Sequence, residues 1–248
     1  MFHNFHEVQH WLNEQFIKSD ICSNDASKIN SKWMDNARLA INKIKGENQF
    51  KLLIESLLND NSYLSEVASG SFQQPNGFDR ISLINNKVPE YKLRLHIWGL
   101  QTRPDSEEDI HNHTYSFASS VLSGLLHQQL FCIVPDASGD WFQYKSLPPL
   151  RDKNGFRFVF EKMTNCEPTI NMQLPAGATY EINRSILHKV VNISDTPSST
   201  LMLQGPYVGN ESTILRSRSI YDLERRQTAN HFSMTEITKL LKKYLDKT

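Results

Sequence analysis

The sequence predicts a mainly β protein with helices at both ends. Its 248 residues suit one large domain or two small ones. Short runs rich in β-branched and aromatic residues fill the middle of the chain, and turn signals separate them. In contrast, apolar residues recur at three- and four-residue steps in the first seventy residues and again near the carboxyl terminus, which is the helical period.

The composition excludes several classes of protein. Lys+Arg and Asp+Glu are both 27, so the net charge is +0, which argues against a dedicated nucleic-acid binder. No apolar run is long enough to span a membrane, and the first residues lack the pattern of a signal peptide. Cys22, Cys132 and Cys166 are far apart and form no CxxC, which argues against a disulfide framework and a thiolate zinc site. We therefore expect a cytoplasmic protein.

The amino-terminal segment, residues 1–75, reads as helical because two amphipathic runs follow one another. Their apolar positions are Phe5, Val8, Leu12, Phe16, Ile29, Trp33, Ala37 and Ile41. The second run ends at Gly46, a common helix stop, and Pro75-Asn76-Gly77 marks a turn.

Residues 76–210 read as about nine short strands. No helices are interleaved with them, so we expect an antiparallel barrel or sandwich rather than βαβ winding. Asn154-Gly155, which lies between two aromatic runs, is the strongest hairpin signal. From about residue 211 the pattern becomes helical again, so we assign residues 211–248 to a carboxyl-terminal helical segment. Ser233 and Glu236 have the spacing of a capping box, and an apolar stripe follows them. We expect the three segments to form one integrated domain.

The chemistry-bearing residues are histidines. His111 and His113 are two residues apart, so on a strand they point to the same face. His188 follows in another strand-like run, after enough chain for hairpins to return it beside the pair. Three neutral imidazoles would make a facial site for a first-row divalent metal and leave positions open for substrate or dioxygen.

The surroundings of these histidines resemble the two sequence motifs of the cupin superfamily. His-x-His is followed by Phe117 and Gly124, and Pro175-Ala176-Gly177 precedes His188, which is followed after three residues by Asn192. The resemblance covers about residues 90–206. It implies a double-stranded β-helix (jelly-roll) barrel with the helical ends packed on it.

Two features depart from the cupin motifs. Phe117 occupies the position of the metal-binding glutamate, and the gap before His188 is longer than usual. A missing glutamate is typical of the cysteine dioxygenase-like branch, and that similarity implies Fe(II) held by His111, His113 and His188. Mn, Ni and Zn are the alternative metals. The Ser-His-Tyr triad of that branch is not matched, because Thr200, Met202 and Gln204 stand at its positions, so cysteine is not the expected substrate.

A strand-like run at residues 91–98 supplies further candidates. Lys92, Arg94, His96 and Trp98 share one of its faces. If that face lines the barrel, Arg94 could bind a substrate carboxylate and His96 could carry a proton. The alternative is a polar stripe that faces solvent. The predicted substrate-binding residues are Arg94, Trp98 and Gln204, and the predicted catalytic residues are His96 and Tyr115.

One carboxylate raises a further alternative. Glu181, in the extended gap before His188, could complete a site of three histidines and one glutamate, although an exposed strand residue is the simpler interpretation.

Three functional hypotheses follow. The first is a mononuclear non-haem Fe(II) oxygenase, dioxygenase-like, that acts on a small carboxylate-bearing molecule and dioxygen. The second is a non-redox metal-dependent isomerase or lyase, and the third is a non-catalytic ligand-binding cupin whose helical ends serve partner contacts or a homodimer. None of them involves nucleic acid or a membrane.

Overall fold

The computed structural model describes residues 1–17, 26–74, 77–100, 108–136, 138–147, 156–191, 196–217, 224–227 and 230–247. The five helices in these ranges are α1 (Phe5–Ile17), α2 (Ala26–Ile44), α3 (Glu47–Asn59), α4 (Asn61–Gly70) and α5 (Met234–Leu245). The strands are β1 (Phe72–Gln73), β2 (Phe78–Lys87), β3 (Glu90–Trp98), β4 (Ile110–His111), β5 (Phe117–Ser123), β6 (Leu125–Val134), β7 (Trp141–Leu147), β8 (Phe156–Pro175), β9 (Thr179–Ile182), β10 (Leu187–Val191), β11 (Ser198–Gln204), β12 (Ser212–Ser217), β13 (Glu224–Gln227) and β14 (Asn230–His231).

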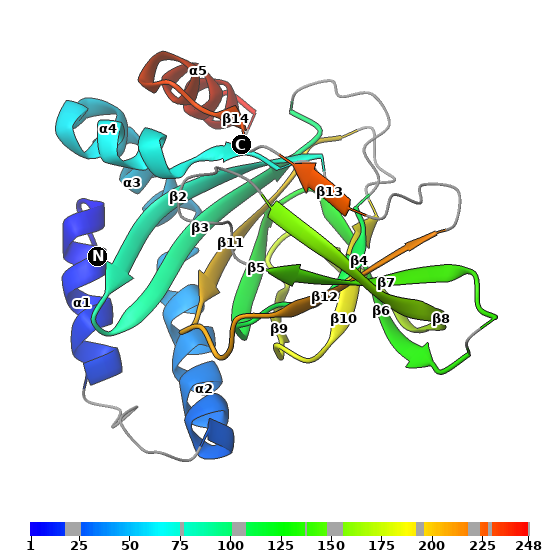
Figure 1. Ribbon diagram of the computed structural model, residues 1–248. Helices are drawn as coiled ribbons and strands as arrows, with labels where there is room; N and C mark the ends of the chain where they lie inside the picture. Colours follow the sequence, from blue (N-terminus) through cyan, green and yellow to red (C-terminus); the bar gives the residue numbers. More distant parts are fainter. Residues whose placement is uncertain are drawn as a thin grey trace.

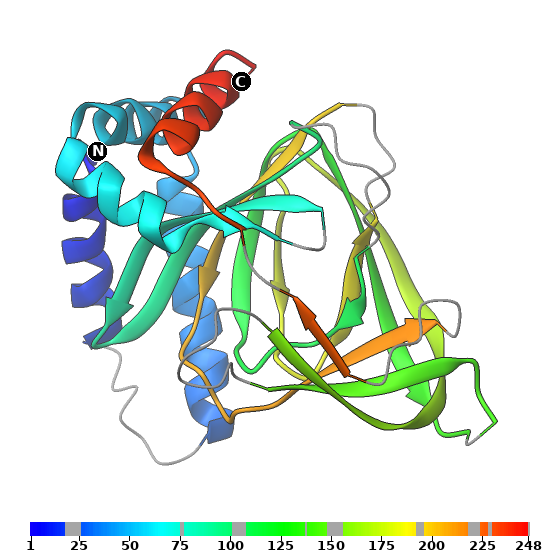
Figure 2. The same cartoon turned by 45° about the horizontal axis from the view of Figure 1, so that its top comes forward.

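The strands form two antiparallel sheets that curve around a common interior (Figure 2). The first sheet has the order β14-β1-β2-β3-β11-β5-β9, and the second has the order β13-β8-β6-β10-β4-β12-β7. The long strand β8 also pairs with β7, so the second sheet closes on itself. The predicted mainly β class with helices at both ends is confirmed, in a jelly-roll arrangement of two facing sheets.

All five helices lie on the outer side of the first sheet (Figure 1). The predicted stripe of α1 is buried, and the stripe of α5 joins the same core. Ser233 and Glu236 form the predicted capping box at the start of α5. At Gly205, just after β11, an added Cβ would meet the Trp33 ring of α2 at 3.0 Å, so the helix approaches the sheet closely there.

Strand β3 has two chemically different faces. Tyr91, Leu93, Leu95 and Ile97 join the core beneath the helices. The alternate residues therefore point to the interior between the two sheets. Arg94 is only 3% exposed, which rules out the interpretation of this face as a stripe in solvent.

The expectation of helix from residue 211 is wrong for the first part of that segment. Residues 212–217 form β12, which pairs with β7 and with β4. The next described stretches are the short strands β13 and β14, and helix begins only at Met234. Asn154 and Gly155 lie outside the described residues, but the flanking strands β7 and β8 pair antiparallel. Within the described ranges, no helix is long and apolar enough to cross a membrane.

Candidate metal centre

Two paired strands bring distant histidines together. His111, at the end of β4, is the register partner of His188 on β10, and His113 follows two residues later. The ring centroids are 4.7 Å apart for His111 and His188, 4.8 Å for His111 and His113, and 5.0 Å for His113 and His188. One ligand atom of each ring lies within 4.8 Å of the others. The structure thus gathers the three histidines of the predicted site.

Backbone carbonyls fix the orientation of two of these rings. His111 Nδ1 donates to the carbonyl oxygen of Asp109 at 2.9 Å, and His188 Nδ1 donates to that of Ile186 at 3.1 Å. Because Nδ1 then carries the proton of a neutral ring, Nε2 keeps its lone pair. Burial lowers the pKa of all three imidazoles, and that of His188 falls to about 3. Neutral imidazoles are the form that binds metal.

The donor set fits a first-row divalent ion. Imidazole nitrogen suits iron, nickel, copper and zinc. The residues that could hold the ion are therefore His111, His113 and His188.

A buried carboxylate lies at the edge of the cluster. Glu108 Oε1 is 3.8 Å from His111 Nε2, and Glu108 Oε2 accepts a hydrogen bond of 2.7 Å from the Val190 backbone. Burial raises the pKa of Glu108 to about 8, against the opposing effect of that hydrogen bond. Glu108 therefore favours its protonated form at neutral pH and is not part of the group of three metal-binding candidates. Phe117, at the motif's glutamate position, packs against the His113 ring with a centroid distance of 5.5 Å.

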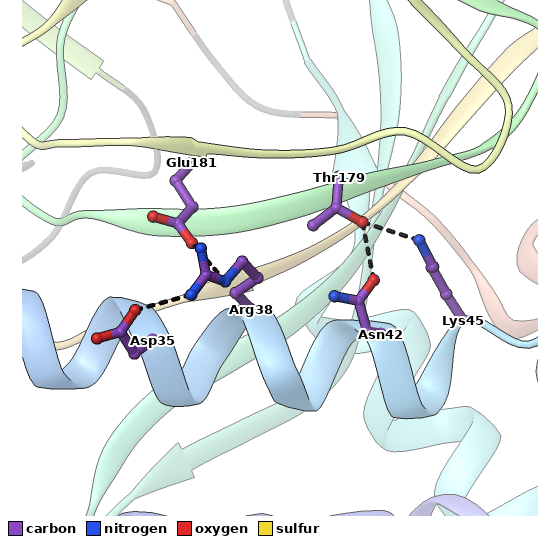
Figure 3. Close-up of polar contacts among 6 residues, drawn as sticks. All are labelled: Asp35, Arg38, Asn42, Lys45, Thr179 and Glu181. Atoms are coloured by element: carbon purple, nitrogen blue, oxygen red, sulfur yellow. Dashed lines mark hydrogen bonds and ion pairs between the residues drawn. The ribbon is translucent and has the colours of Figure 1, made fainter.

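Glu181 lies elsewhere. It is exposed on β9, and its Oε1 is 3.5 Å from Arg38 Nε of α2. Figure 3 shows this contact beside the hydrogen bonds that Asn42 of the same helix and Lys45, just after its end, make with Thr179. Glu181 therefore ties the helix to the barrel, and the alternative that it completes the metal site is wrong.

A buried ion pair supports the segment before β4. Arg216 of β12 donates from Nε and Nη2 to Asp109 Oδ2, at 3.0 and 2.5 Å. The carbonyl of the same aspartate holds the His111 ring. Arg216 is 3% exposed, so this tie is shielded from water.

Two cavities meet at the histidines. The outer cavity has a volume of about 530 Å³, and the inner one about 70 Å³. His111 and His113 line both, whereas His188 and Glu108 line the inner one. A small molecule could therefore occupy the outer cavity and present one end to the cluster.

Of the other predicted site residues, four line the cavities and Gln204 does not. Arg94 and Tyr115 line both cavities, and His96 and Trp98 line the inner one. Tyr115 stacks on the His113 ring with a centroid distance of 4.6 Å, and its hydroxyl accepts a bond of 3.3 Å from Arg94 Nη1. Gln204 is fully buried and lines neither cavity, because β11 presents Met202 there instead.

Sequence reasoning missed three residues at the site. Arg80 on β2 and Tyr207 after β11 line the outer cavity, and Glu108 lines the inner one. Arg80 had only a weak signal, because an isoleucine follows it in a strand-like run but an aspartate precedes it, whereas Arg94 lies between two leucines. Glu108 stands in an acidic run that is typical of a solvated loop, and Tyr207 follows the end of a strand. Neither residue had a sequence signal that pointed to the site.

Comparisons with known proteins give remote similarities. The sequence matches no protein-family model and no curated protein. A structure of oxalate oxidase aligns at 15% identity and a TM-score of 0.32 over 57% of this chain and 56% of that one. A hydroxypropylphosphonic acid epoxidase from S. wedmorenis aligns at 12% identity and 0.31, over 79% and 96%. A structure from work on the DMSP lyases RdDddP and RnDddQII aligns at 16% and 0.27, over 61% and 53%. The chain thus spans little more than half of the oxalate oxidase, and no family membership follows from these similarities.

Proposed function

We propose that this protein is a metal-dependent enzyme, a mononuclear non-haem Fe(II) oxygenase that oxidises a small carboxylate-bearing molecule with dioxygen. The observation that carries the proposal is the cluster of three neutral histidines, one buried and two partly buried, at the junction of two cavities. Ferrous iron bound there would supply oxygen activation and substrate orientation. A cytoplasmic setting is part of the proposal, because a reducing compartment keeps iron ferrous.

The protein's own residues would bind and orient the substrate. Arg94 is fixed on a buried strand, and its guanidinium offers two parallel donors to a carboxylate. Tyr115 lies between Arg94 and His113, so it would keep the bound carboxylate at a set distance from the histidines.

The inner cavity provides a group that could move a proton. Burial, together with the charges of Arg94 and Arg80, holds the pKa of His96 well below its ordinary value, so its ring is neutral. Its Nε2 is buried and has no hydrogen-bond partner among the described residues. His96 is thus placed to accept a proton from the substrate or to pass one on.

The first test measures metal content and oxygen uptake. We expect about one iron per chain after anaerobic loading with Fe(II), loss of that iron in His111→Ala, and retention in His127→Ala. His127 is a matched control, because it lies on β6 outside the cluster. Small carboxylic acids are then screened for oxygen consumption. Iron-loaded protein that consumes no oxygen with any of them would contradict the oxygenase proposal.

A non-redox isomerase or lyase is the second candidate, favoured by one observation. Burial would raise the pKa of Tyr207, but the positive charges of Arg94 and Lys92 bring it down to about 8. A phenol of that pKa near the histidine cluster could, once ionised, abstract a proton from a substrate. Turnover with redox-inert Zn(II), without oxygen, would favour this candidate. Ligand binding without turnover under either condition would instead favour a binding protein.

A further inference from the structure

Two arginines from neighbouring strands converge on the cavities. In the β2–β3 ladder, Arg80 is opposite His96 and Ser82 is opposite Arg94, so the two arginines are diagonal neighbours on the same face. Both side chains line the outer and the inner cavity. Two permanent positive charges therefore lie side by side next to the three histidines.

These charges lack the carboxylate partners that Arg38 and Arg216 have. Arg216 pairs with Asp109, and Arg38 pairs with Asp35 and Glu181. In the part of the chain that the structure describes, no carboxylate forms an ion pair with Arg80 or Arg94, and the Nε of each is buried without an acceptor.

The contacts that the two guanidinium groups do make position them and leave their charge unneutralised. Arg80 lies over the Phe72 ring, with its central carbon 3.8 Å from the centroid. Arg94 donates a hydrogen bond of 3.3 Å to the Tyr115 hydroxyl, and within the described part of the chain it donates none to a carboxylate. Burial and the neighbouring charge of Arg94 lower the pKa of Arg80 to about 9, so Arg80 remains charged at neutral pH.

Two buried positive charges side by side are unfavourable without a bound anion. Each loses hydration on burial and repels the other, and a protein tolerates this where a ligand supplies the opposite charge. A single carboxylate on Arg94 would leave Arg80 without a counter-charge. We propose that the substrate carries two negative charges, one for each guanidinium. This inference rests on the proposed function, since it takes the cavity beside the histidines as the substrate site.

Two arrangements of charge satisfy this requirement. One is a single doubly ionised head, such as a phosphate monoester, held between both guanidinium groups. The other is a pair of carboxylates on a short chain, each bound through two parallel N–H···O bonds. The shared chemistry is a small dianion, and the experiment includes both arrangements.

The test compares ligands that differ in charge and little else. Succinate is paired with its monoamide succinamate, and propyl phosphate, whose second pKa is about 6, with propyl sulfate. Binding is measured by calorimetry on the full chain at about pH 7.5, where carboxylates are fully ionised. Metal-free and Zn(II)-loaded protein are both used. We expect at least one dianion to bind about tenfold or more tightly than its monoanionic partner, because one charge-assisted hydrogen-bonded pair contributes at least that factor. Equal binding within both pairs would overturn the inference, and this comparison needs no variant.

Variants then test whether Arg80 binds the second negative charge of the ligand. Arg80→Gln should remove the preference for the dianion while monoanion binding changes less than about twofold, because only the second charge loses its partner. Arg38→Gln, which alters an exposed pair on α2 (Figure 3), should keep the preference. A preference that persists in Arg80→Gln would contradict the role of Arg80.

The outcome is separable from that of the oxygenase test. Dianion preference without oxygen consumption would leave this inference standing and remove the proposed reaction. Oxygen consumption that is equally efficient with monoanions and dianions would support the proposed reaction and overturn this inference.

Discussion

Tyr207 lies where several charges of the site meet. Its hydroxyl accepts a hydrogen bond of 3.1 Å from Lys92 Nζ, and its ring is edge-on to Tyr115 at 5.5 Å between centroids. Although burial opposes ionisation, the charges of Arg94 and Lys92 lower its pKa to about 8. A tyrosine thus titrates close to neutrality, at the rim of a cationic pocket.

We expect dicarboxylate binding to weaken as the pH rises through about 8. Above that pH the Tyr207 phenolate supplies a negative charge that competes with the ligand for Arg94, and the loss reaches up to about tenfold per pH unit. Succinate titrations between about pH 6.5 and 8.5 measure this, since the ligand's charge is constant there and Arg80, whose pKa is about 9, keeps most of its charge. Tyr207→Phe should give a flat profile, and an unchanged slope in that variant would show that another group is responsible.

The same pKa shift affects folding with a defined sign. An unfolded tyrosine titrates near 10, so between about pH 8 and 10 the unfolded chain binds more protons than the folded one. The folded state therefore gains stability from Tyr207 as the pH rises through that window. The gain is lost as the pH falls through about 8.

At the scale of elements, β12 is tied to the segment before β4 by the buried pair of Arg216 and Asp109. We expect Arg216→Met to lower the free energy of unfolding by about 3 kcal/mol, because Asp109 keeps a buried charge without a partner. Metal affinity should fall at least about tenfold, since the same aspartate carbonyl orients His111. Denaturant titration and metal competition measure the two effects.

An exposed ion pair provides the control for this change. Arg38→Met breaks the pair with Asp35 on the same helix and the contact with Glu181 of β9, and the side chains of these residues are 30–65% exposed. Its cost should stay below about 1 kcal/mol, with metal affinity unchanged. Equal effects of the two variants would show that the buried pair has no special role.

The elements that sequence reasoning predicted well are those with local signals. Helix α5 is set by its own capping box and apolar stripe, so its pattern was sufficient. Strand β12 has no such signal, because its pairing joins Ile214 to His111 and Leu215 to Ile110, more than a hundred residues earlier. Read locally, its arginine-containing sequence resembled the start of a helical segment.

At the scale of the whole molecule, the same distinction explains the site. The His-x-His spacing and the later His188 indicated the cluster, since these motifs can be recognised without knowing which strands pair. The role of Arg80 depends on the register of β2 against β3, and that of Glu108 on the packing of β10, which no local pattern contains. The roles of these residues, and of all predicted site residues, remain predictions.

Metal binding should be coupled to global stability. A ligand at a thousand times its dissociation constant stabilises the folded state by about 4 kcal/mol if the unfolded chain does not bind it. We expect Zn(II) to raise the midpoint of thermal unfolding of the wild type but not of His188→Ala. Removal of the ion with a chelator should reverse the shift. A similar rise in both proteins would place the binding elsewhere.

The helical layer behind β3 has a consequence for how a ligand meets the arginines. The apolar residues on the back of this strand are locked into the core, so the backbone under Arg94 is immobilised when the chain folds. Little conformational freedom then remains to be lost at the moment of association. The arginines should therefore bind a ligand without rearranging. Substitutions that weaken the packing of α2 on the sheet, away from the pocket, should reduce the selectivity of ligand binding.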